Sequence, residues 1–444
     1  MKILKIAIAL IISTYALIFS INIEVFILIS LFLILLFVIP SALLNRKIMF
    51  FFILSPFFIL PQLKRYDVIP ILSWNITVPI IILLFVLILS KVRLDNSYNL
   101  LFIFFIFYMG IEIFRGWNYG YEMRYLFGET IKYIFYPLGF YFTYSIFNNE
   151  NEDEKILKYL LLFFILMGMI ISLQIIYYYF YVTFGDRVIT RQANLLIISF
   201  ISALAYILYF SEDIFNKILL GSSIILYLIS LIIIMQRSLW IGFIISLFLF
   251  ILLYQRKFIK SNFKKIVLVF LIFFILFGTY LIYESIVIDK SVLEERTDVI
   301  GKKGKTFSIG ARILSYYHAF RLFLQNPILG KGMGDSIITP YLNQREIGIV
   351  DNSYLVVLWK MGIIGFLIFL FLYVKFLTQL IKIITKTKFK LHRLFGIIII
   401  SIIVGQMING LACVIMTLYF FNIIWGVFIA ITDYLYRKEF VLNE

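Results

Sequence analysis

Long uninterrupted runs of apolar residues recur along almost the whole chain. Each run is about 20 residues long, which is the length that an α-helix needs to cross about 30 Å of hydrocarbon. Of the 444 residues, 63% are hydrophobic and 14% are charged, whereas soluble domains carry about 45–50% apolar and about 25% charged residues. The runs are continuous rather than alternating, which excludes a β-barrel. The sequence therefore predicts an all-α polytopic membrane protein.

We expect about 12 to 14 transmembrane helices. The predicted segments are roughly 4–20, 24–40, 48–60, 75–90, 99–114, 126–147, 157–183, 194–210, 218–235, 238–254, 266–283, 355–379, 394–412 and 414–433. The third segment is short enough to be re-entrant. The chain then divides into transmembrane helices at 1–283, one large extracytoplasmic loop at 284–354, and further helices with a cytoplasmic C-terminus at 355–444.

The distribution of basic residues predicts the orientation of these helices. If the N-terminus lies in the cytoplasm, the two densest clusters of lysine and arginine, at 255–265 and 382–393, both fall inside. This is the pattern that the positive-inside rule requires. It places Glu284–Tyr354 outside. The net charge of +16 then reflects membrane sidedness and does not indicate a nucleic-acid partner.

The short outer loops hold arginines where the positive-inside rule disfavours them. Arginine presents a rigid fork of donors that matches phosphate or carboxylate, whereas lysine is a point charge. The outer arginines are Arg65, Arg115, Arg124, Arg187, Arg191 and Arg237. Two explanations stay open for the first three: they bind an anionic substrate, or they contact headgroups and pair with nearby carboxylates. The candidate carboxylates are Asp67, Glu112, Glu122, Glu129 and Asp186.

Arg237 lies in M-Q-R-S-L-W, between two predicted segments with almost no loop between them. Gln236, Arg237 and Ser238 must therefore lie at the very end of two helices. Ser238 is a candidate N-cap, and an arginine beside a helix N-terminus suits a pyrophosphate group. The alternative is an interfacial arginine that reaches the headgroups. We favour a functional role for Arg237 over a headgroup contact, because ionisable residues in membrane segments usually mark a functional site.

The outer loop is expected to contain an amphipathic helix at Ile309–Gln325, capped by Ser308. Its apolar stripe is expected to pack on the end of the helix bundle. The stripe consists of Ile309, Ile313, Tyr317, Phe320 and Leu324. Arg312 lies in the first turn, where a cation opposes the helix dipole, so it is interpreted as serving an anion. His318 is either a half-buried, hydrogen-bonded histidine or an alternative general base.

Asn326-Pro327 ends this helix, and the glycines of G-K-G-M-G (Gly330, Gly332 and Gly334) follow. A dinucleotide-binding fingerprint would need a preceding strand and a βαβ unit, so we expect a tight turn instead. Asp351 and Asn352 come directly before the next predicted segment. Two roles stay open for Asp351, namely the N-cap of that helix or a general base at the membrane surface.

The order of these motifs resembles the O-antigen ligase/polymerase family. The resemblance rests on Q-R-S-L-W, then R-x-x-x-Y-Y-x-A, then N-P-I-L-G-K-G-M-G, then D-N-S-Y-L-x-x-L-x-x-x-G-x-x-G. It covers about Met235–Gly365. It implies a GT-C-like membrane fold and a metal-independent, inverting glycosyltransferase. Such enzymes take a glycan from undecaprenyl pyrophosphate on the outer face of the bacterial inner membrane.

The resemblance also implies roles for single residues. Arg237 matches the arginine that grips the donor pyrophosphate, Arg312 matches an arginine of the outer loop, and Asp351 falls where ligases have a histidine. The further candidates for substrate binding are Arg187, Arg191, Gln236, Ser238, Asn352 and Tyr354. No cofactor or metal is expected, because the sequence has no cluster of His, Asp or Glu with metal-ligand spacing.

The departure at Asp351 favours a polymerase of O-antigen or capsular polysaccharide. The alternatives are a ligase that transfers the glycan to lipid A core and, as a different class, a flippase for lipid-linked oligosaccharides. The expected partners are a lipid-linked glycan donor, a glycan acceptor and membrane lipids, with a chain-length regulator and a flippase as further partners, and no nucleic acid.

Overall fold

The computed structural model describes residues 98–144, 153–181, 193–210, 214–234, 236–254, 307–338, 346–347, 350–411, 413 and 419–441. Every predicted transmembrane segment that falls on these residues forms a helix. The predicted segments at 4–20, 24–40, 48–60, 75–90 and 266–283 lie outside the described residues.

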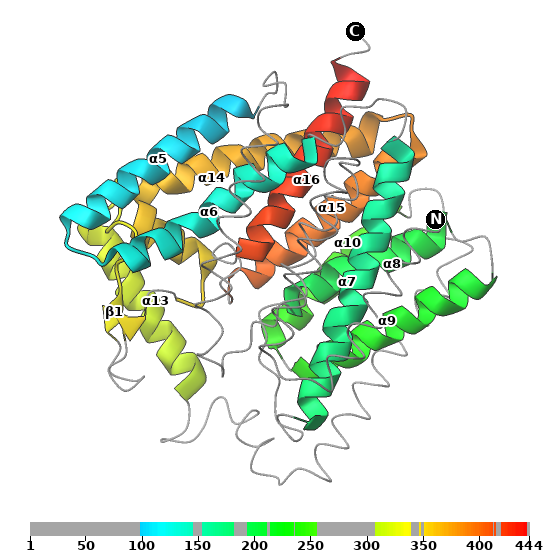
Figure 1. The fold of residues 1–444 in the computed structure, drawn as a ribbon, viewed down its shortest axis with the longest axis horizontal. Helices are drawn as coiled ribbons and strands as arrows, with labels where there is room; N and C mark the ends of the chain where they lie inside the picture. Colours follow the sequence, from blue (N-terminus) through cyan, green and yellow to red (C-terminus); the bar gives the residue numbers. More distant parts are fainter. Residues whose placement is uncertain are drawn as a thin grey trace, which may run out of the picture. The chain divides into compact units, whose positions relative to one another are not determined.

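The helices and strands are arranged as Figure 1 shows. In chain order they are α5 (Asn99–Asn118), α6 (Met123–Tyr144), α7 (Asp153–Tyr181), α8 (Asn194–Tyr209), α9 (Ile214–Ile234), α10 (Arg237–Tyr254), α13 (Phe307–Gln325), β1 (Ile337–Ile338), β2 (Glu346–Ile347), α14 (Ser353–Lys386), α15 (Lys390–Asn409) and α16 (Tyr419–Phe440). Within the described ranges, the strands are limited to β1 and β2, which pair antiparallel with Ile337 opposite Ile347.

The described part of the chain has the architecture of a polytopic helical membrane protein. By length and composition, α5, α7, α9, α14 and α15 can cross a membrane, and α8 and α10 are shorter apolar helices. Two helices run well past their predicted ends. α14 continues to Lys386 instead of ending at 379, and α16 continues to Phe440 instead of ending at 433. An apolar run sets the presence of a helix, whereas its last turns depend on the residues that it contacts.

Small residues allow the helices to approach closely. A Cβ added to Gly139 of α6 would lie 2.1 Å from the carbonyl oxygen of Ile423 in α16. A Cβ on Gly242 of α10 would lie 2.7 Å from the carbonyl oxygen of Gly405 in α15. Such contacts are typical of helix packing in membranes, where van der Waals contact replaces the hydrophobic effect as the driving force.

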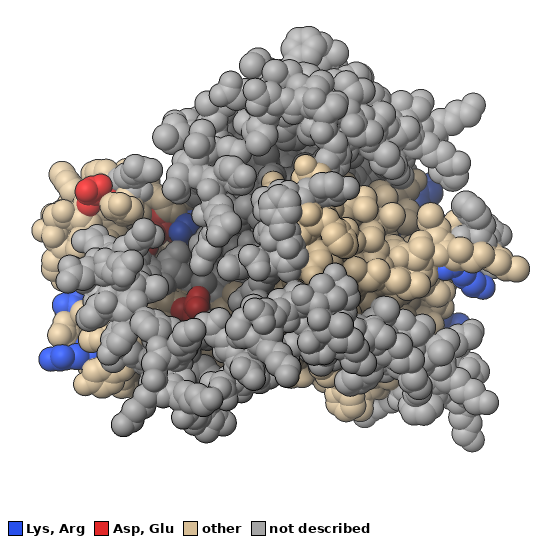
Figure 2. Space-filling view, turned by 90° about the horizontal axis from the view of Figure 1, so that it is seen from below, with Lys and Arg blue, Asp and Glu red and all other residues tan. Residues whose placement is uncertain are grey.

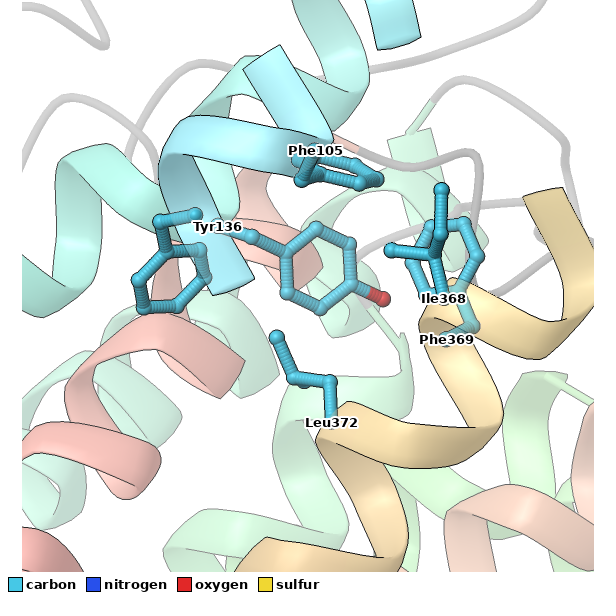
Figure 3. Close-up of a pocket in the computed structure, with 6 residues that line it drawn as sticks. Phe105, Tyr136, Ile368, Phe369 and Leu372 are labelled. Carbon is cyan, nitrogen blue, oxygen red and sulfur yellow. The ribbon is translucent and has the colours of Figure 1, made fainter. Parts of the chain in front are cut away.

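α5 and α14 run antiparallel along each other. Tyr98 donates a hydrogen bond to Gln379 at one end, Phe105 packs edge-on against Phe369 in the middle, and Tyr108 bonds to the Met361 carbonyl nearer the other end. A small pocket between α5, α6 and α14 is lined by Phe102, Phe105, Tyr136, Ile368, Phe369 and Leu372 (Figure 3). The only polar group in this lining is the Tyr136 hydroxyl, which lies 3.2 Å from that of Tyr373. The pocket therefore belongs to the apolar core.

Several basic side chains lie at one end of the helices. Lys158 at the start of α7 contacts the rings of Tyr206 and Phe210 at the end of α8. Lys382 near the end of α14 donates to Tyr436 near the end of α16. These are residues that the charge pattern assigns to the cytoplasmic side. α13 lies at the other end, away from the C-terminus (Figure 1).

Candidate active site

The starts of α10 and α14 meet at the segment that follows α15. The Ser353 amide donates to the Gly410 carbonyl (2.9 Å), and the Ser353 hydroxyl donates to the Cys413 carbonyl (2.8 Å). From α10, the Gln236 side chain donates to the Cys413 sulfur (3.4 Å). Residues that are far apart in the sequence therefore lie together at the end that holds α13. The predicted sharp connection between α9 and α10 is confirmed, since α9 ends at Ile234 and α10 begins at Arg237.

The N-cap predicted for α10 is wrong by two residues. Ser238 lies inside the first turn, and the Gln236 carbonyl accepts the first helical hydrogen bonds, from Leu239 (3.0 Å) and Trp240 (3.2 Å). The Ser238 hydroxyl instead accepts a hydrogen bond from the Gln236 side chain (3.3 Å). The helix starts earlier because α9 stops at Ile234 and leaves almost no chain for a separate cap.

Asn352, and not Asp351, caps α14. The Asn352 side-chain oxygen accepts hydrogen bonds from the amides of Tyr354 and Leu355, both at 3.0 Å, and its amide group donates to the Leu411 carbonyl. The extended backbone of Asn352 (φ −151°, ψ 110°) is the usual conformation of an N-cap. The hypothesis that Asp351 is the cap is therefore wrong. Asp351 is exposed, and its carbonyl accepts a hydrogen bond from the Tyr316 hydroxyl (2.5 Å).

The predicted helix of the outer loop is confirmed as α13, and so is its end. Its predicted start and N-cap are wrong. The helix begins at Phe307, so Ser308 lies within it instead of capping it, and it ends at Gln325 before Asn326-Pro327. The face that packs on α14 and Val350 is formed by Ala319 and Tyr316.

The stripe predicted to pack on the bundle is wrong in its described part. Tyr317, Phe320 and Leu324 are 60%, 45% and 58% exposed. The small Ala319 lets α13 approach α14 closely, which turns the larger apolar side chains outward. The side chains of Ile309 and Ile313 lie outside the described residues.

The structure describes the backbone of Arg237 and Arg312 but not their side chains. Arg237 is the first residue of α10, at the end where α10 and α14 meet. Arg312 precedes Tyr316 by one helical turn, and residues at this spacing share a face. Tyr316 hydrogen-bonds the carbonyls of Asp351 and Leu411. The helix face that carries Arg312 is therefore the one that reaches Asp351.

Other candidates from the sequence have structural contacts or lie outside the described residues. The Tyr354 hydroxyl donates to the Met407 carbonyl (2.7 Å). His318 is half-buried and lies beside the Tyr317 ring. Arg187 and Arg191 fall outside the described ranges. Within those ranges, no group of three or more His, Cys, Asp or Glu is arranged to hold a metal ion.

The turn after α13 inserts into a break in α14. Gly362 has a non-helical backbone (φ 62°, ψ −163°), although helix continues on both sides of it. The groups freed by this break bond to the turn. Lys331 and Gly332 donate to the carbonyls of Trp359 (2.8 Å) and Lys360 (2.9 Å), while Ile363 and Ile364 donate to those of Pro327 (2.8 Å) and Ile328 (3.2 Å). Irregular backbone in a membrane segment is tolerated when it is satisfied in this way.

Two glycines make this insertion possible. Gly330 has a φ of 72°, and a Cβ there would lie 2.5 Å from the Lys360 carbonyl oxygen. A Cβ on Gly362 would lie 2.4 Å from the Ile328 carbonyl oxygen. Both positions thus need glycine for the positive φ and for close contact. The predicted tight turn is confirmed, and its partner is the backbone of α14.

The guanidinium of Arg115 is engaged by the protein itself. One of its terminal nitrogens contacts both oxygens of the fully buried Glu112 (2.8 and 3.0 Å) and the Leu329 carbonyl (2.6 Å). The other donates to the Gly330 carbonyl (2.8 Å). Of the two explanations for this arginine, pairing with a carboxylate is confirmed. Arg65 and the Arg124 side chain lie outside the described residues.

A second buried ion pair was not predicted. Lys360 of α14 is 1% exposed and pairs closely with Glu129 of α6. The other oxygen of Glu129 accepts a hydrogen bond from the Gly334 amide (2.8 Å). The signal was present in the sequence, because Lys360, Glu129 and Glu112 each interrupt an apolar run, and a charge at that depth needs a partner.

Asp335 connects the turn to α14 and to the loop between α5 and α6. Its two oxygens accept hydrogen bonds from the Tyr121 hydroxyl (2.8 Å) and the Trp359 indole (2.7 Å). Burial, followed by the hydrogen bond to Asp335, raises the pKa of the Tyr121 hydroxyl. Tyr121 therefore stays a donor at neutral pH. In Figure 2, which views the molecule from below, acidic and basic side chains are visible among the described residues.

One family of known proteins matches this part of the chain. Residues 222–370 match the family model described as O-antigen ligase. The match runs from α9 to just beyond the break in α14, and it confirms the resemblance to the O-antigen ligase/polymerase family. No curated protein is significantly similar to the chain.

Proposed function

We propose that this membrane protein polymerises lipid-linked oligosaccharide repeat units. The proposal starts from the match of residues 222–370 to the O-antigen ligase family model. The donor is a glycan on undecaprenyl pyrophosphate, the acceptor is a second lipid-linked unit, and the product is an O-antigen or capsular polysaccharide. The reaction takes place on the outer face of the bacterial cytoplasmic membrane. The observation that carries this proposal is the convergence of α10, α13 and the start of α14 at the end opposite to Lys158 and Lys382.

The residues at this end suit glycosyl transfer from a pyrophosphate. The leaving group needs no protonation, so the charge that develops is negative, and fixed arginine donors stabilise such charge. Arg237 lies at the N-terminus of α10, where the helix dipole also favours an anion. We assign to Arg237 the role of binding the pyrophosphate, and to Arg312 of α13 that of a second cation for the same group.

The acceptor sugar hydroxyl requires at most one base. Asp351 is exposed beside the start of α14, and the cap of that helix is made by Asn352. Its carboxylate is therefore not needed to hold the helix end. We assign to Asp351 the role of accepting the proton from the acceptor hydroxyl or orienting that hydroxyl.

A ligase that transfers the glycan to lipid A core is the second candidate. It is favoured by the description of the family model, whereas Asp351 in place of the histidine that ligases are expected to carry favours the polymerase. A flippase is less well supported, because it would need a charged path through the bundle, and Arg115 and Lys360 are both paired there.

The glycan that accumulates in a deletion strain distinguishes these functions. Loss of a polymerase leaves single repeat units on the lipid anchor or on lipid A core. Loss of a ligase leaves long lipid-linked polymer and bare core. The second pattern would overturn the polymerase assignment, and wild-type glycan would overturn both. Purified protein mixed with a lipid-linked repeat unit should produce a ladder of longer products without any further enzyme.

A further inference from the structure

The described part of the molecule holds two ion pairs around one loop segment. They are Glu112–Arg115 on α5 and Glu129–Lys360, which joins α6 to α14. We name these four residues the loop anchor. All of them lie in apolar helices, where a charge is costly unless it is paired. A buried ion pair contributes little net stability in place of a well-packed apolar pair, so stability alone does not explain their presence.

Three members of the loop anchor contact the same segment, residues 327–335. Arg115 donates to the carbonyls of Leu329 (2.6 Å) and Gly330 (2.8 Å). Glu129 accepts from the Gly334 amide (2.8 Å), and Lys360 holds the other oxygen of Glu129. The Lys360 carbonyl also accepts from Gly332 (2.9 Å). The anchor thus fixes both sides of the turn in the break of α14.

The turn determines where α13 lies. It begins directly after α13 ends at Gln325, and α13 packs through Ala319 on the first turns of α14. α13 carries Arg312, and the start of α14 follows Asp351. A turn that left the break would move α13 relative to α14, and with it the distance between Arg312 and Asp351. A misplacement of about 1 Å can cost a reaction on the order of 100-fold in rate.

We propose that Glu129 and Lys360 are positioning residues of the transferase site. They hold the 327–335 turn in the break of α14 and so set α13 against Asp351, without contact to the substrate. This inference rests on the proposed function for its catalytic consequence. Its structural part, that Glu129 holds the turn through the Gly334 amide, stands on the contacts alone.

Two double variants isolate this role. Glu129→Gln with Lys360→Met removes both charges but keeps a side-chain oxygen for the Gly334 amide. Glu129→Leu with Lys360→Met removes the charges and that oxygen. Since neither leaves an unpaired buried charge, both should insert and unfold at temperatures close to that of the wild type. Lys382→Met is the matched control, because Lys382 is an exposed lysine on the same helix.

The full-length protein in lipid nanodiscs is examined by hydrogen exchange across residues 326–338 and by transfer of a lipid-linked repeat unit. With Glu129→Leu/Lys360→Met, exchange in this segment should rise, and kcat should fall on the order of 10- to 100-fold. The donor KM should change much less. Glu129→Gln/Lys360→Met should recover most of the protection and the rate.

Equal exchange and equal rates in the two double variants would overturn the proposal, since they differ in the hydrogen-bond acceptor for Gly334. A rate loss without faster exchange would also overturn it. If the wild-type protein transfers no glycan, the proposed function fails, and the exchange comparison still decides whether Glu129 holds the turn.

Discussion

The two halves of α14 use the same residue type in opposite ways. In the first half, Lys360 is 1% exposed and paired with Glu129, and the helix breaks two residues later at Gly362. In the second half, the helix is regular, and Lys382 and Lys386 are exposed near its end. One helix thus carries a lysine that holds a loop and lysines that can lie in water.

Burial accounts for the difference. An exposed lysine near a helix end can reach water or headgroups with its long side chain, so it needs no carboxylate partner. A lysine that is buried within the bundle, as Lys360 is, cannot reach water and needs a carboxylate. A paired, buried lysine beside a broken helix therefore indicates a place where the helices bind a loop segment, which is here the 327–335 turn.

The largest expected effect is that of Lys360→Met. The substitution leaves Glu129 charged and buried without its partner, which should destabilise the protein by about 3–5 kcal/mol. Lys382→Met should change stability by less than about 0.5 kcal/mol. Thermal unfolding of the detergent-purified variants measures both. If Lys360→Met and Lys382→Met lower the stability by the same amount, burial does not explain the difference between the lysines of the two halves of α14.

The second effect is that of Gly362→Ala. The added Cβ would lie 2.4 Å from the Ile328 carbonyl oxygen at a φ of 62°. The positive φ costs about 1–3 kcal/mol, and the overlap adds to that. Gly110→Ala is the control in α5, because nothing lies within 4 Å of its added Cβ, and it should stabilise by up to about 1 kcal/mol. A stable Gly362→Ala protein with an unchanged turn would show that the break is not needed.

Arg237→Lys extends the comparison to the two ends of the bundle. Lysine keeps the charge but loses the forked contact with pyrophosphate, so the rate of transfer should fall on the order of 10²-fold. Membrane insertion should not change. Arg393→Lys, at the start of α15, should leave the rate within about threefold, because a basic residue there needs only its charge. Wild-type polymer length with Arg237→Lys would reduce Arg237 to a headgroup contact.

Asp351→Asn and Asp351→Ser test the start of α14. Neither side chain can take a proton at neutral pH, so the rate should fall about 10²-fold in both variants. Unfolding should stay at the wild-type temperature, because the cap is Asn352. Near wild-type turnover by both variants, at matched expression, would remove Asp351 from the mechanism and make His318 the next residue to examine.

The smallest expected effect is that of Asn352→Ala. Loss of the side-chain oxygen that accepts from Tyr354 and Leu355 should cost about 1 kcal/mol. Thr378→Ala is the control in the second half of α14, where the hydroxyl bonds only within its own helix, and it should change stability by less than about 0.5 kcal/mol. Equal losses of stability in Asn352→Ala and Thr378→Ala would show that the side-chain cap does not stabilise the start of α14.

Within the described ranges, the sequence by itself determined the helical segments, their order and their turning points. Apolar length and the distribution of lysine are local properties, and Asn326-Pro327 ends α13 because proline cannot continue a helix. The same holds for the sharp connection at Gln236, where two apolar runs leave no room for a loop. The candidate site could be placed at one end for this reason.

Only the tertiary structure decided which of the charged and polar residues are already engaged. Arg115 bonds to a carbonyl 214 residues away, and Lys360 pairs with a carboxylate 231 residues away. No local pattern selects such partners, because they depend on which helices become neighbours. The packing face of α13 follows the same rule. Its apolar residues fit more than one stripe, and the contact through Ala319 with Val356 and Trp359 of α14 selected the one that is buried.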